Sequence, residues 1–553
     1  MFQSFNNRFG HYALLLAVAG VLIFPHLGRP SLWDIDEGNN AEAAREMMES
    51  ENWIVPTFNY QLRVDKPALL YWLQIAGYRL CGVNELAARL PSALAALLTV
   101  LLVYELARGM FNRATGLIAG IMVVSTIGFC ASAHFANPDA LLHACTTLSL
   151  LIFWRSYAKS GRGWFVPAGI AAGFAVLAKG PVGLVLPLAV VASFLLWSGQ
   201  LRLLWDRRLI LGGLAFTLVA LPWYIWVTND TKGDFLRGFF GTHNVNRFLN
   251  PMENHRGPIF YYLAVLAVGF APWSIFLGFA AWYGTGERGR QDDGNSVGER
   301  KIGAVYRFLW CWIAVYLLFF SLAATKLPNY ILPVYTPLAI LTARFLERWR
   351  RQAIAPPQWA FLLSLSCLML VGFGTSFGLL VAGGTIDMAK LHGRQLPGLA
   401  SWALLGVFPV LGAASSWWCL RRQWRTALIG SVGLSAVFFL GTLATYGSVT
   451  LDGFKAPRGL VKASKAQDTQ HEIRVGSYRY FQPSLVFYCR REVQQCATEE
   501  QALEFLRMPL QTYLFLPAVE WQALEGKLHR PHRPLARHYD LYRHCEIVVV
   551  TNR

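Results

Sequence analysis

Two short polar stretches near the N-terminus hold residue types that could do chemistry at a membrane surface. Residues 33–38, Trp-Asp-Ile-Asp-Glu-Gly, follow the first apolar segment, and residues 63–67, Arg-Val-Asp-Lys-Pro, precede another apolar run. Acidic groups beside a membrane helix are costly to hold and usually have a function. We interpret the two stretches as one site, in which Asp36 and Glu37 handle a substrate and Lys66 holds an anion. The alternative is ordinary solvated loop charge, and these residues alone do not separate the two interpretations.

Further charged and aromatic groups stand at the ends of later apolar segments. Asp139 lies at the expected start of a helix, where the alternative is an ordinary acidic first turn. Lys179 lies at another turn, and we favour a lysine that snorkels to the interface there. Lys326 and Tyr330 are either ligand contacts or interfacial anchors. Arg256 belongs to a long loop, 228–257, whose other polar residues include His243, Asn246, Arg247 and His255.

Composition indicates a membrane protein with many helices. Hydrophobic residues make up 54% of the 553 residues, and long apolar stretches recur along most of the chain. The net charge of +18 could suggest a nucleic-acid partner. The basic residues, however, lie in short loops between apolar segments, where they act as topology signals and contact anionic lipid. We therefore expect a membrane partner and no nucleic acid.

Thirteen apolar stretches of the sequence predict helices. Their approximate ranges are 11–28, 86–107, 114–133, 138–157, 163–178, 180–197, 207–227, 258–281, 303–322, 329–346, 357–383, 397–418 and 426–448. We interpret the first as a membrane span rather than a signal peptide, because it lacks a clear small-residue cleavage site and candidate functional residues follow it.

Charge alternates between successive loops. One set of loops is rich in arginine and lysine, for example at Arg108, Arg113, Arg207, Arg350 and Arg421. The positive-inside rule places this set in the cytoplasm. The other set then lies on the opposite face, together with the tail after residue 451. The candidate residues Asp36, Lys66, Asp139, Arg256 and Lys326 belong to that second set, so we expect them to converge on the outer face.

The first outer loop, residues 29–85, contains more than a linker. Asn39-Asn40-Ala41-Glu42 resembles a capping box and predicts a helix lying along the membrane surface. The almost wholly apolar run 67–80 is short for a span and predicts an interfacial or re-entrant helix that starts at Pro67. Lys66 would then stand at a helix N-terminus, where an anion is already favoured.

The tail mixes polar residues with short β-like runs, which predicts a small α/β domain. The expected strands are Glu472–Gly476, Thr512–Leu516 and Glu546–Thr551, with a helix at Glu499–Arg507. We therefore divide the chain into a transmembrane catalytic domain, 1–450, and a C-terminal domain, 451–553. In an oxidising compartment, Cys489 and Cys496 either form a disulfide or stay free thiols.

The order of the motifs resembles one known family. Trp-Asp-x-Asp-Glu at 33–37 is followed by Ala-Glu-Ala-Ala-Arg-Glu-Met at 41–47, Asn-Trp-Ile-Val-Pro at 52–56 and Asp-Lys-Pro-Ala-Leu-Leu-Tyr-Trp at 65–72. Leu-Ala-Lys-Gly at 177–180, His-Arg-Gly-Pro at 255–258 and Lys-Leu-Pro-Asn-Tyr at 326–330 extend the match over essentially the whole chain. This series resembles the GT-C membrane glycosyltransferases, most of all the lipid A aminoarabinose transferases and the related protein O-mannosyltransferases.

The resemblance implies a mainly α, polytopic GT-C fold with about thirteen transmembrane helices, juxtamembrane helices in the first periplasmic loop and a small periplasmic α/β domain. It implies an inverting transfer of 4-amino-4-deoxy-L-arabinose from undecaprenyl phosphate to lipid A phosphate, at the periplasmic face of the bacterial inner membrane. Resistance to polymyxin and cationic antimicrobial peptides would follow. The expected partners are this donor, lipid A and the membrane, with no cofactor and a monomeric protein.

The resemblance also implies roles for individual residues. Asp36 and Asp139 match the family's essential acids, with Glu37 beside Asp36. Lys66 is expected to meet the lipid phosphate. Further candidates for that phosphate are Arg256, Tyr330 and Lys326. Cations such as Lys66 and Arg256 suit the reaction, because breaking a sugar–phosphate bond leaves negative charge on the phosphate, which they would stabilise.

The function of Asp36 stays open between positioning the acceptor, positioning the donor sugar and pairing with the sugar's 4-ammonium group. Some members of the superfamily bind a divalent metal with such acids. Here His243, His255 and Asp65 have no specific metal-ligand spacing, so we predict no metal.

Two other functions fit parts of the sequence. The same fold could transfer another sugar, such as mannose or galacturonate, to lipid A or to protein. A lipid flippase or transporter would place its polar groups near the bilayer midplane within broken helices. The central parts of these segments hold few ionisable residues, which favours a transferase.

Overall fold

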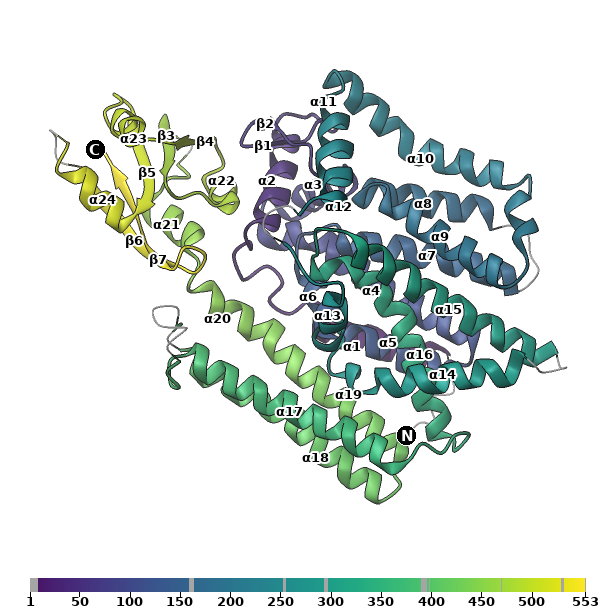
Figure 1. The fold of residues 1–553 in the computed structure, drawn as a ribbon. Coiled ribbons are helices and arrows are strands. Elements are labelled where there is room, and N and C mark those ends of the chain that lie inside the picture. The colour runs from purple at the N-terminus through teal and green to yellow at the C-terminus, as the bar shows by residue number, and fades with distance from the viewer. Residues whose placement is uncertain are drawn as a thin grey trace.

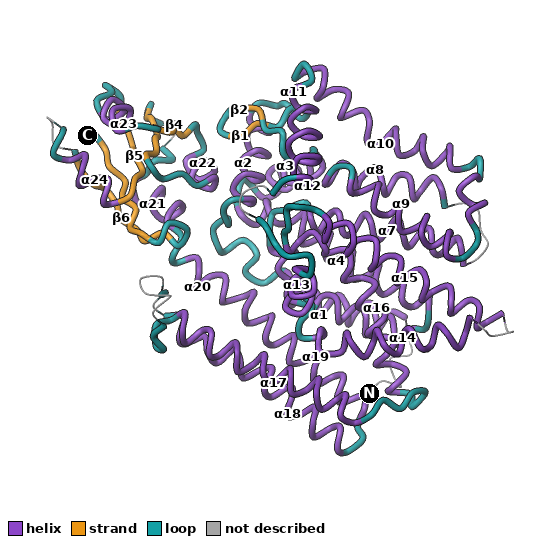
Figure 2. The backbone as a smooth tube through the Cα atoms, viewed as in Figure 1, coloured by secondary structure: helices purple, strands orange, loops and turns teal. Residues whose placement is uncertain are grey.

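The computed structural model describes residues 8–158, 164–251, 255–292, 297–388, 395–396, 398–468, 470–528 and 532–552, with side chains left undescribed at 286–292 and 297–301. Helices make up most of this structure, and the strands of its larger sheet gather near the C-terminus (Figure 1, Figure 2). The protein is therefore mainly helical, as its composition predicts.

The helices up to residue 452 have the following bounds. They are α1 Arg8–Ile23, α2 Asp36–Glu49, α3 Leu69–Cys81, α4 Glu85–Met110, α5 Arg113–Val124, α6 Ile127–His134, α7 Asp139–Ala158, α8 Phe165–Lys179, α9 Val182–Trp197, α10 Leu209–Asp230, α11 Asp234–Leu236, α12 Arg247–Leu249, α13 Tyr261–Gly269, α14 Leu277–Asp292, α15 Val297–Leu322, α16 Tyr335–Arg350, α17 Gln358–Ala382, α18 Val407–Arg421, α19 Arg425–Thr442 and α20 Ser448–Asp452. Tighter or wider turns occupy η1 Leu201–Trp205, η2 Arg237–Asn246, η3 Trp273–Phe276, η4 Pro328–Val334, η6 Leu399–Gly406 and η7 Leu443–Gly447.

Six of the described helices are long and apolar enough to cross a membrane, or up to eight if each of two bent pairs is one span. The first bent pair is α5 with α6, which meet at 62°. Its break has a local cause, since the hydroxyls of Ser125 and Thr126 return to the carbonyls of Ile121 and Val123 and compete with the helix. The second pair, α13 with the helix from Trp273, bends by 115°. The structure thus gives a multi-pass helical protein, while the count of thirteen spans stays a prediction.

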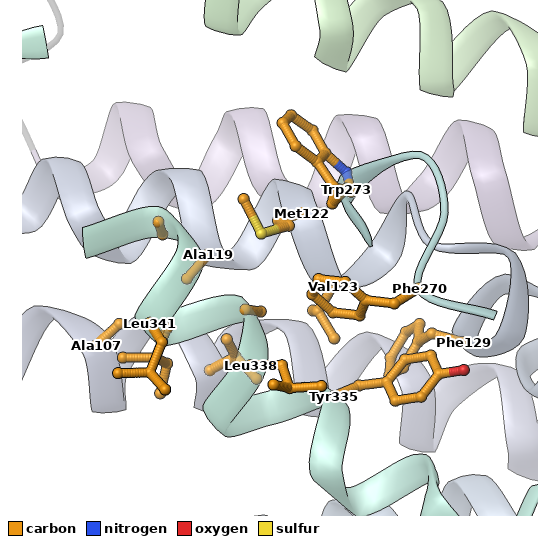
Figure 3. Close-up of a cluster of buried hydrophobic side chains, with 14 of the residues drawn as sticks. Ala107, Ala119, Met122, Val123, Phe129, Phe270, Trp273, Tyr335, Leu338 and Leu341 are labelled. Atoms are coloured by element: carbon orange, nitrogen blue, oxygen red, sulfur yellow. The ribbon is translucent and has the colours of Figure 1, made fainter. Parts of the chain in front are cut away.

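The helices pack closely because small residues line their contacts. Figure 3 shows the small side chains of Ala107 and Ala119 buried among the larger ones of this core. A Cβ added at Gly116 of α5 would lie 2.8 Å from a carbonyl oxygen of α4. Small side chains let two helix backbones approach, which is the usual basis of helix association in membranes.

The two helices of the first outer loop start elsewhere than predicted. Helix α2 begins at Asp36 rather than after Asn39, and the carboxylate of Glu42, which would have completed the capping box, accepts two hydrogen bonds from Arg45 instead. Helix α3 begins at Leu69 rather than at Pro67. Lys66 therefore lies ahead of the helix and not at its N-terminus. Between the helices, β1 Thr57–Phe58 pairs with β2 Gln61–Leu62.

The tail forms a five-stranded sheet with helices. Its strands are β3 Ile473–Tyr478, β4 Val493–Cys496, β5 Gln511–Pro517, β6 Arg533–Asp540 and β7 Cys545–Thr551, in the order β4-β3-β5-β7-β6. Its helices are α21 Ala456–Ser464, α22 Pro483–Cys489, α23 Glu499–Leu506 and α24 Ala518–Glu525. Strand β3 pairs in parallel with both neighbours, and β7 pairs antiparallel with β5 and β6.

The three expected strands and the expected helix of the tail are confirmed. The two strands that the sequence did not indicate, β4 and β6, are the edges of the sheet. Edge strands tolerate polar residues and irregular pairing, and β6 has a register shift near Pro534. Of the two alternatives for Cys489 and Cys496, the structure shows free thiols, and both side chains are buried.

Candidate active site

A polar cavity of about 570 Å³ collects residues from distant parts of the chain. Asp36 comes from the start of α2, Lys66 from the loop before α3, and Asp139 from the start of α7. Arg247 enters from α12 and Tyr330 from η4. Of the carboxylates and cations predicted to converge, Asp36, Asp139 and Lys66 therefore line one cavity.

Lys66 is held by a neighbouring carboxylate on one side of this cavity. Its Nζ lies 3.0 Å from Oδ1 of Asp65, whose Oδ2 accepts a hydrogen bond from Arg63 at 2.9 Å. Burial alone would lower the pKa of Lys66, but the carboxylates of Asp65 and Asp36 raise it above its ordinary value. Burial would raise the pKa of Asp65, but Lys66, Arg63 and His243 lower it overall. Both groups are therefore charged, and Lys66 presents a cation to the cavity.

Asp139 is engaged at both of its oxygens. Lys179 at the end of α8 forms an ion pair with Oδ1, and Asn329 donates to Oδ2 at 2.7 Å. The Nζ of Lys179 also lies 5.0 Å from the centre of the Tyr330 ring, within the range of a cation–π contact. Asp139 thus ties α7, α8 and η4 together and keeps Lys179 at the cavity wall.

Asp36 is the acid of residues 33–38 that faces the cavity. It is exposed, and among the described residues no hydrogen bond or ion pair ends on its carboxylate. Its negative charge is close enough to raise the pKa of Lys66. A carboxylate that faces a cation across the cavity in this way is available to contact a bound molecule.

The side chain of Glu37, the next residue, is used in a buried ion pair. Its carboxylate accepts hydrogen bonds from Arg89 at 2.9 and 2.7 Å and from the backbone N–H groups of Ala136 and Trp33 at 2.6 and 2.7 Å. Both members of the pair are buried, at 1% and 2% exposure. Arg89 also donates to the carbonyls of Leu27, Pro30 and Ser31. The geometry makes Glu37 a residue that positions the acidic loop, instead of the expected catalytic acid.

We expect Glu37→Ala to destabilise the protein strongly, because it leaves Arg89 buried without its carboxylate. Breaking a buried ion pair in this way costs about 3–5 kcal/mol. Glu49→Ala is the matched control, since Glu49 lies on the same helix and pairs with Arg45 but is 52% exposed. The control should change stability by less than about 1 kcal/mol. Thermal unfolding of the two purified variants in one detergent measures the difference, and equal midpoints would contradict the assignment.

The tail also holds the acidic loop in place. Asp34 accepts hydrogen bonds from the backbone N–H and hydroxyl of Ser484 at 2.7 and 2.5 Å. Lys455 donates to the carbonyl of Ser31 at 2.7 Å, and its Nζ lies 4.1 Å from the centre of the Trp33 ring. The loop that carries Asp36 is therefore fixed between α4 and the tail.

Two apolar cavities border the polar one. The first, of about 390 Å³, has aromatic walls that include Phe239, Phe248 and Phe320. It shares Asp65, Lys66, Lys179, His243, Arg247 and Tyr330 with the polar cavity. The second, of about 590 Å³, lies against α6, α13 and η4, and it shares Ile35, Asp36, Asn137, Asp139 and Asn329. The arrangement suits two amphipathic molecules, one meeting the cations and the other meeting the acids.

Two of the predicted phosphate contacts lie elsewhere. Lys326 donates to the carbonyls of Ser321 and Ala323 at 2.8 and 2.6 Å, where it satisfies the end of α15. Arg256 is exposed and lies outside the described linings of the three cavities. The polar cavity is lined instead by two other cations, Arg247 from the same loop and Lys179. Within the described residues, no group of three or more His, Cys, Asp or Glu is arranged to hold a metal ion.

Known proteins share this fold. ArnT from Cupriavidus metallidurans, solved bound to undecaprenyl phosphate, aligns with a TM-score of 0.80 over 99% of both chains at 24% identity. The family described as dolichyl-phosphate-mannose-protein mannosyltransferase matches residues 65–226. The fold is that of a GT-C membrane glycosyltransferase.

Curated relatives narrow that class. The undecaprenyl phosphate-α-4-amino-4-deoxy-L-arabinose arabinosyl transferase of Erwinia tasmaniensis is 32% identical over 450 residues, which are 77% of this chain and 76% of the relative. The protein of the same name from Pseudomonas paraeruginosa is 30% identical, over 78% of this chain and 76% of the relative. The chain belongs to this arabinosyl transferase family, and the resemblance seen in its motifs is confirmed.

Proposed function

We propose that this protein transfers 4-amino-4-deoxy-L-arabinose from undecaprenyl phosphate to a phosphate of lipid A, at the periplasmic face of the bacterial inner membrane. This modification protects the cell against polymyxin and cationic antimicrobial peptides. The observation that carries the proposal is the polar cavity in which Lys66 and Arg247 face Asp36, with an apolar cavity on each side. Membership of the family supports the sugar and the carrier.

The donor fits the cationic side. Its polyprenyl chain would lie against Phe239, Phe248 and Phe320, and its phosphate would meet Lys66 and Arg247. Tyr330 and Lys179 complete that wall. Hydrogen bonds from cations to phosphate are roughly twice as strong as neutral ones, and they act where negative charge develops.

The acceptor fits the acidic side. Acyl chains of lipid A would enter the second apolar cavity, whose border with the polar cavity holds Asp36 and Asp139. The acceptor phosphate is already an anion and needs little help from a general base. We therefore assign Asp36 to positioning the sugar or the acceptor, and Asp139 to holding Lys179 in place.

The reaction is then a displacement with inversion at the anomeric carbon. An oxygen of the acceptor phosphate forms the new bond to this carbon as the bond to the undecaprenyl phosphate oxygen breaks. The electron pair of the broken bond stays on the departing phosphate, where Lys66 and Arg247 stabilise it. No proton has to move in this step.

A reconstitution in detergent tests the function. The purified protein, mixed with the aminoarabinose donor and lipid A, should convert lipid A to a product that carries the mass increment of one aminoarabinose. Detergent leaves no membrane to cross, so a flippase or transporter would yield no product. The corresponding mannosyl donor is the second arm, because part of the chain matches the mannosyltransferase family. Transfer from that donor alone would replace the proposed sugar.

We also propose thirteen spans, with the polar cavity and the tail on the periplasmic side. Val519 of α24 and Trp205 of η1 are 73% and 86% exposed and lie on opposite sides of this topology. In cells whose exposed Cys81 and Cys367 are replaced by serine, an impermeant thiol reagent should label Val519→Cys and miss Trp205→Cys. Permeabilised cells, in which both should react, provide the control. The reverse pattern in intact cells contradicts the topology.

A further inference from the structure

A separate cavity of about 710 Å³ lies between α1, α5 and α19, at the opposite end of these helices from the active site. These helices lie near the N-terminus in Figure 1. Helix α1 contributes His11 to this cavity, while its far end leads to the acidic loop. Helix α5 contributes Arg113 from its first turn, while the helix that follows it, α6, borders the active site. The cavity is therefore a site of its own.

One end of the cavity is strongly cationic. Arg113, Arg350 and Arg351 belong to its lining, and no Asp or Glu does within the part of the chain that the structure describes. Two of these arginines, Arg350 and Arg351, donate hydrogen bonds to Glu347 at 2.6 and 2.5 Å. Three guanidinium groups therefore gather at one end of a lining that holds no carboxylate among its described residues.

The rest of the cavity is apolar and opens toward the membrane. Leu14, Val18, Ile121 and Val437 line it. Leu434 of α19, in the middle of a candidate span, also belongs to its wall and is 61% exposed. At Gly430 an added Cβ would meet nothing within 4 Å. The cavity thus has a lateral opening at the depth where acyl chains lie.

We propose that this cavity binds one anionic glycerophospholipid of the cytoplasmic leaflet. Its phosphate would sit among the three arginines, and an acyl chain would run along Val18, Ile121 and Val437. A soluble anion would leave the apolar wall without a contact, and a neutral lipid would leave the arginines without an anionic group. Basic pockets between membrane helices on this side commonly recognise anionic headgroups. The bound lipid would fill the space between α1, α5 and α19.

Native mass spectrometry of the detergent-purified protein tests this. After exchange into dioleoylphosphatidylglycerol, wild type should retain one such lipid and should bind it at least about tenfold more tightly than dioleoylphosphatidylcholine. Equal retention of the two lipids overturns the proposal. Preference for undecaprenyl phosphate over phosphatidylglycerol at this cavity also overturns it, since the occupant would then be the carrier lipid.

Two variants locate the bound lipid. Arg113→Gln/Arg351→Gln should weaken phosphatidylglycerol binding about tenfold, and Gly430→Leu should abolish it by filling the cavity. Arg207→Gln/Arg208→Gln removes as much charge from two exposed arginines outside this cavity, and Gly374→Leu adds the same side chain to open space on α17. Both controls should bind like wild type. Retention by Gly430→Leu at the wild-type level overturns the proposal even if the arginine variant fails to fold.

Discussion

Lys66→Ala is expected to lose donor binding and activity together. One charge-assisted contact to phosphate in a partly desolvated site contributes about 1.5–3 kcal/mol, so donor affinity should fall at least about tenfold. The fold should survive, because Asp65 keeps its ion pair with Arg63. Binding of undecaprenyl phosphate to the purified variant, measured by intrinsic tryptophan fluorescence, provides the readout.

The controls separate phosphate binding from general effects. Lys66→Arg should recover part of the affinity, since a guanidinium also fits phosphate but at a different reach. Lys462→Ala removes an exposed lysine of the tail and should leave binding unchanged. If Lys66→Ala binds the donor like wild type while remaining folded, the phosphate lies elsewhere and the proposed donor side is wrong.

Asp36→Asn is expected to collapse turnover while donor binding persists. The substitution keeps the shape of the side chain and removes a charge that faces the polar cavity, where we propose that the sugar and the acceptor bind. A misplaced reacting group costs on the order of a hundredfold in rate, so we expect kcat to fall by about that factor or more. The apparent affinity for undecaprenyl phosphate, which lacks the sugar, should stay within about twofold of wild type.

Asp234→Asn is the matched control for Asp36. It removes an exposed carboxylate, 64% accessible, that pairs with Arg237 on the surface, and it should leave kcat unchanged. Asp139→Asn should behave differently from Asp36→Asn, because it breaks the ion pair that holds Lys179 and so disturbs the cationic wall as well. Wild-type turnover in Asp36→Asn would show that the assignment of this residue to the active site is wrong.

The sequence by itself determined the class of the protein. The long apolar runs of this sequence indicate segments that lie in a bilayer. Such segments form helices, because in a bilayer only helices and closed barrels satisfy all of their backbone hydrogen bonds internally. The central strands β3, β5 and β7 were also predicted, since buried strands need β-branched and aromatic residues. The edge strands were not, because a half-exposed edge accepts sequences such as Arg533–Asp540. The sequence also indicated the chemistry of the site, because its candidate carboxylates and cations lie in the loops that are predicted to share one face of the membrane.

Which of these charges meet was decided by tertiary structure alone. Asp36 and Glu37 are adjacent and chemically alike. The side chain of Glu37 nevertheless points toward Arg89 and pairs with it, while Asp36 faces the cavity. Arg247 and Arg256 share one loop, and only Arg247 reaches the wall. Lys179 could be taken from sequence for an interfacial lysine until Asp139, on another helix, was seen to hold it. Side-chain direction depends on which helix end packs against which, and those contacts are non-local, so no spacing along the chain encodes them.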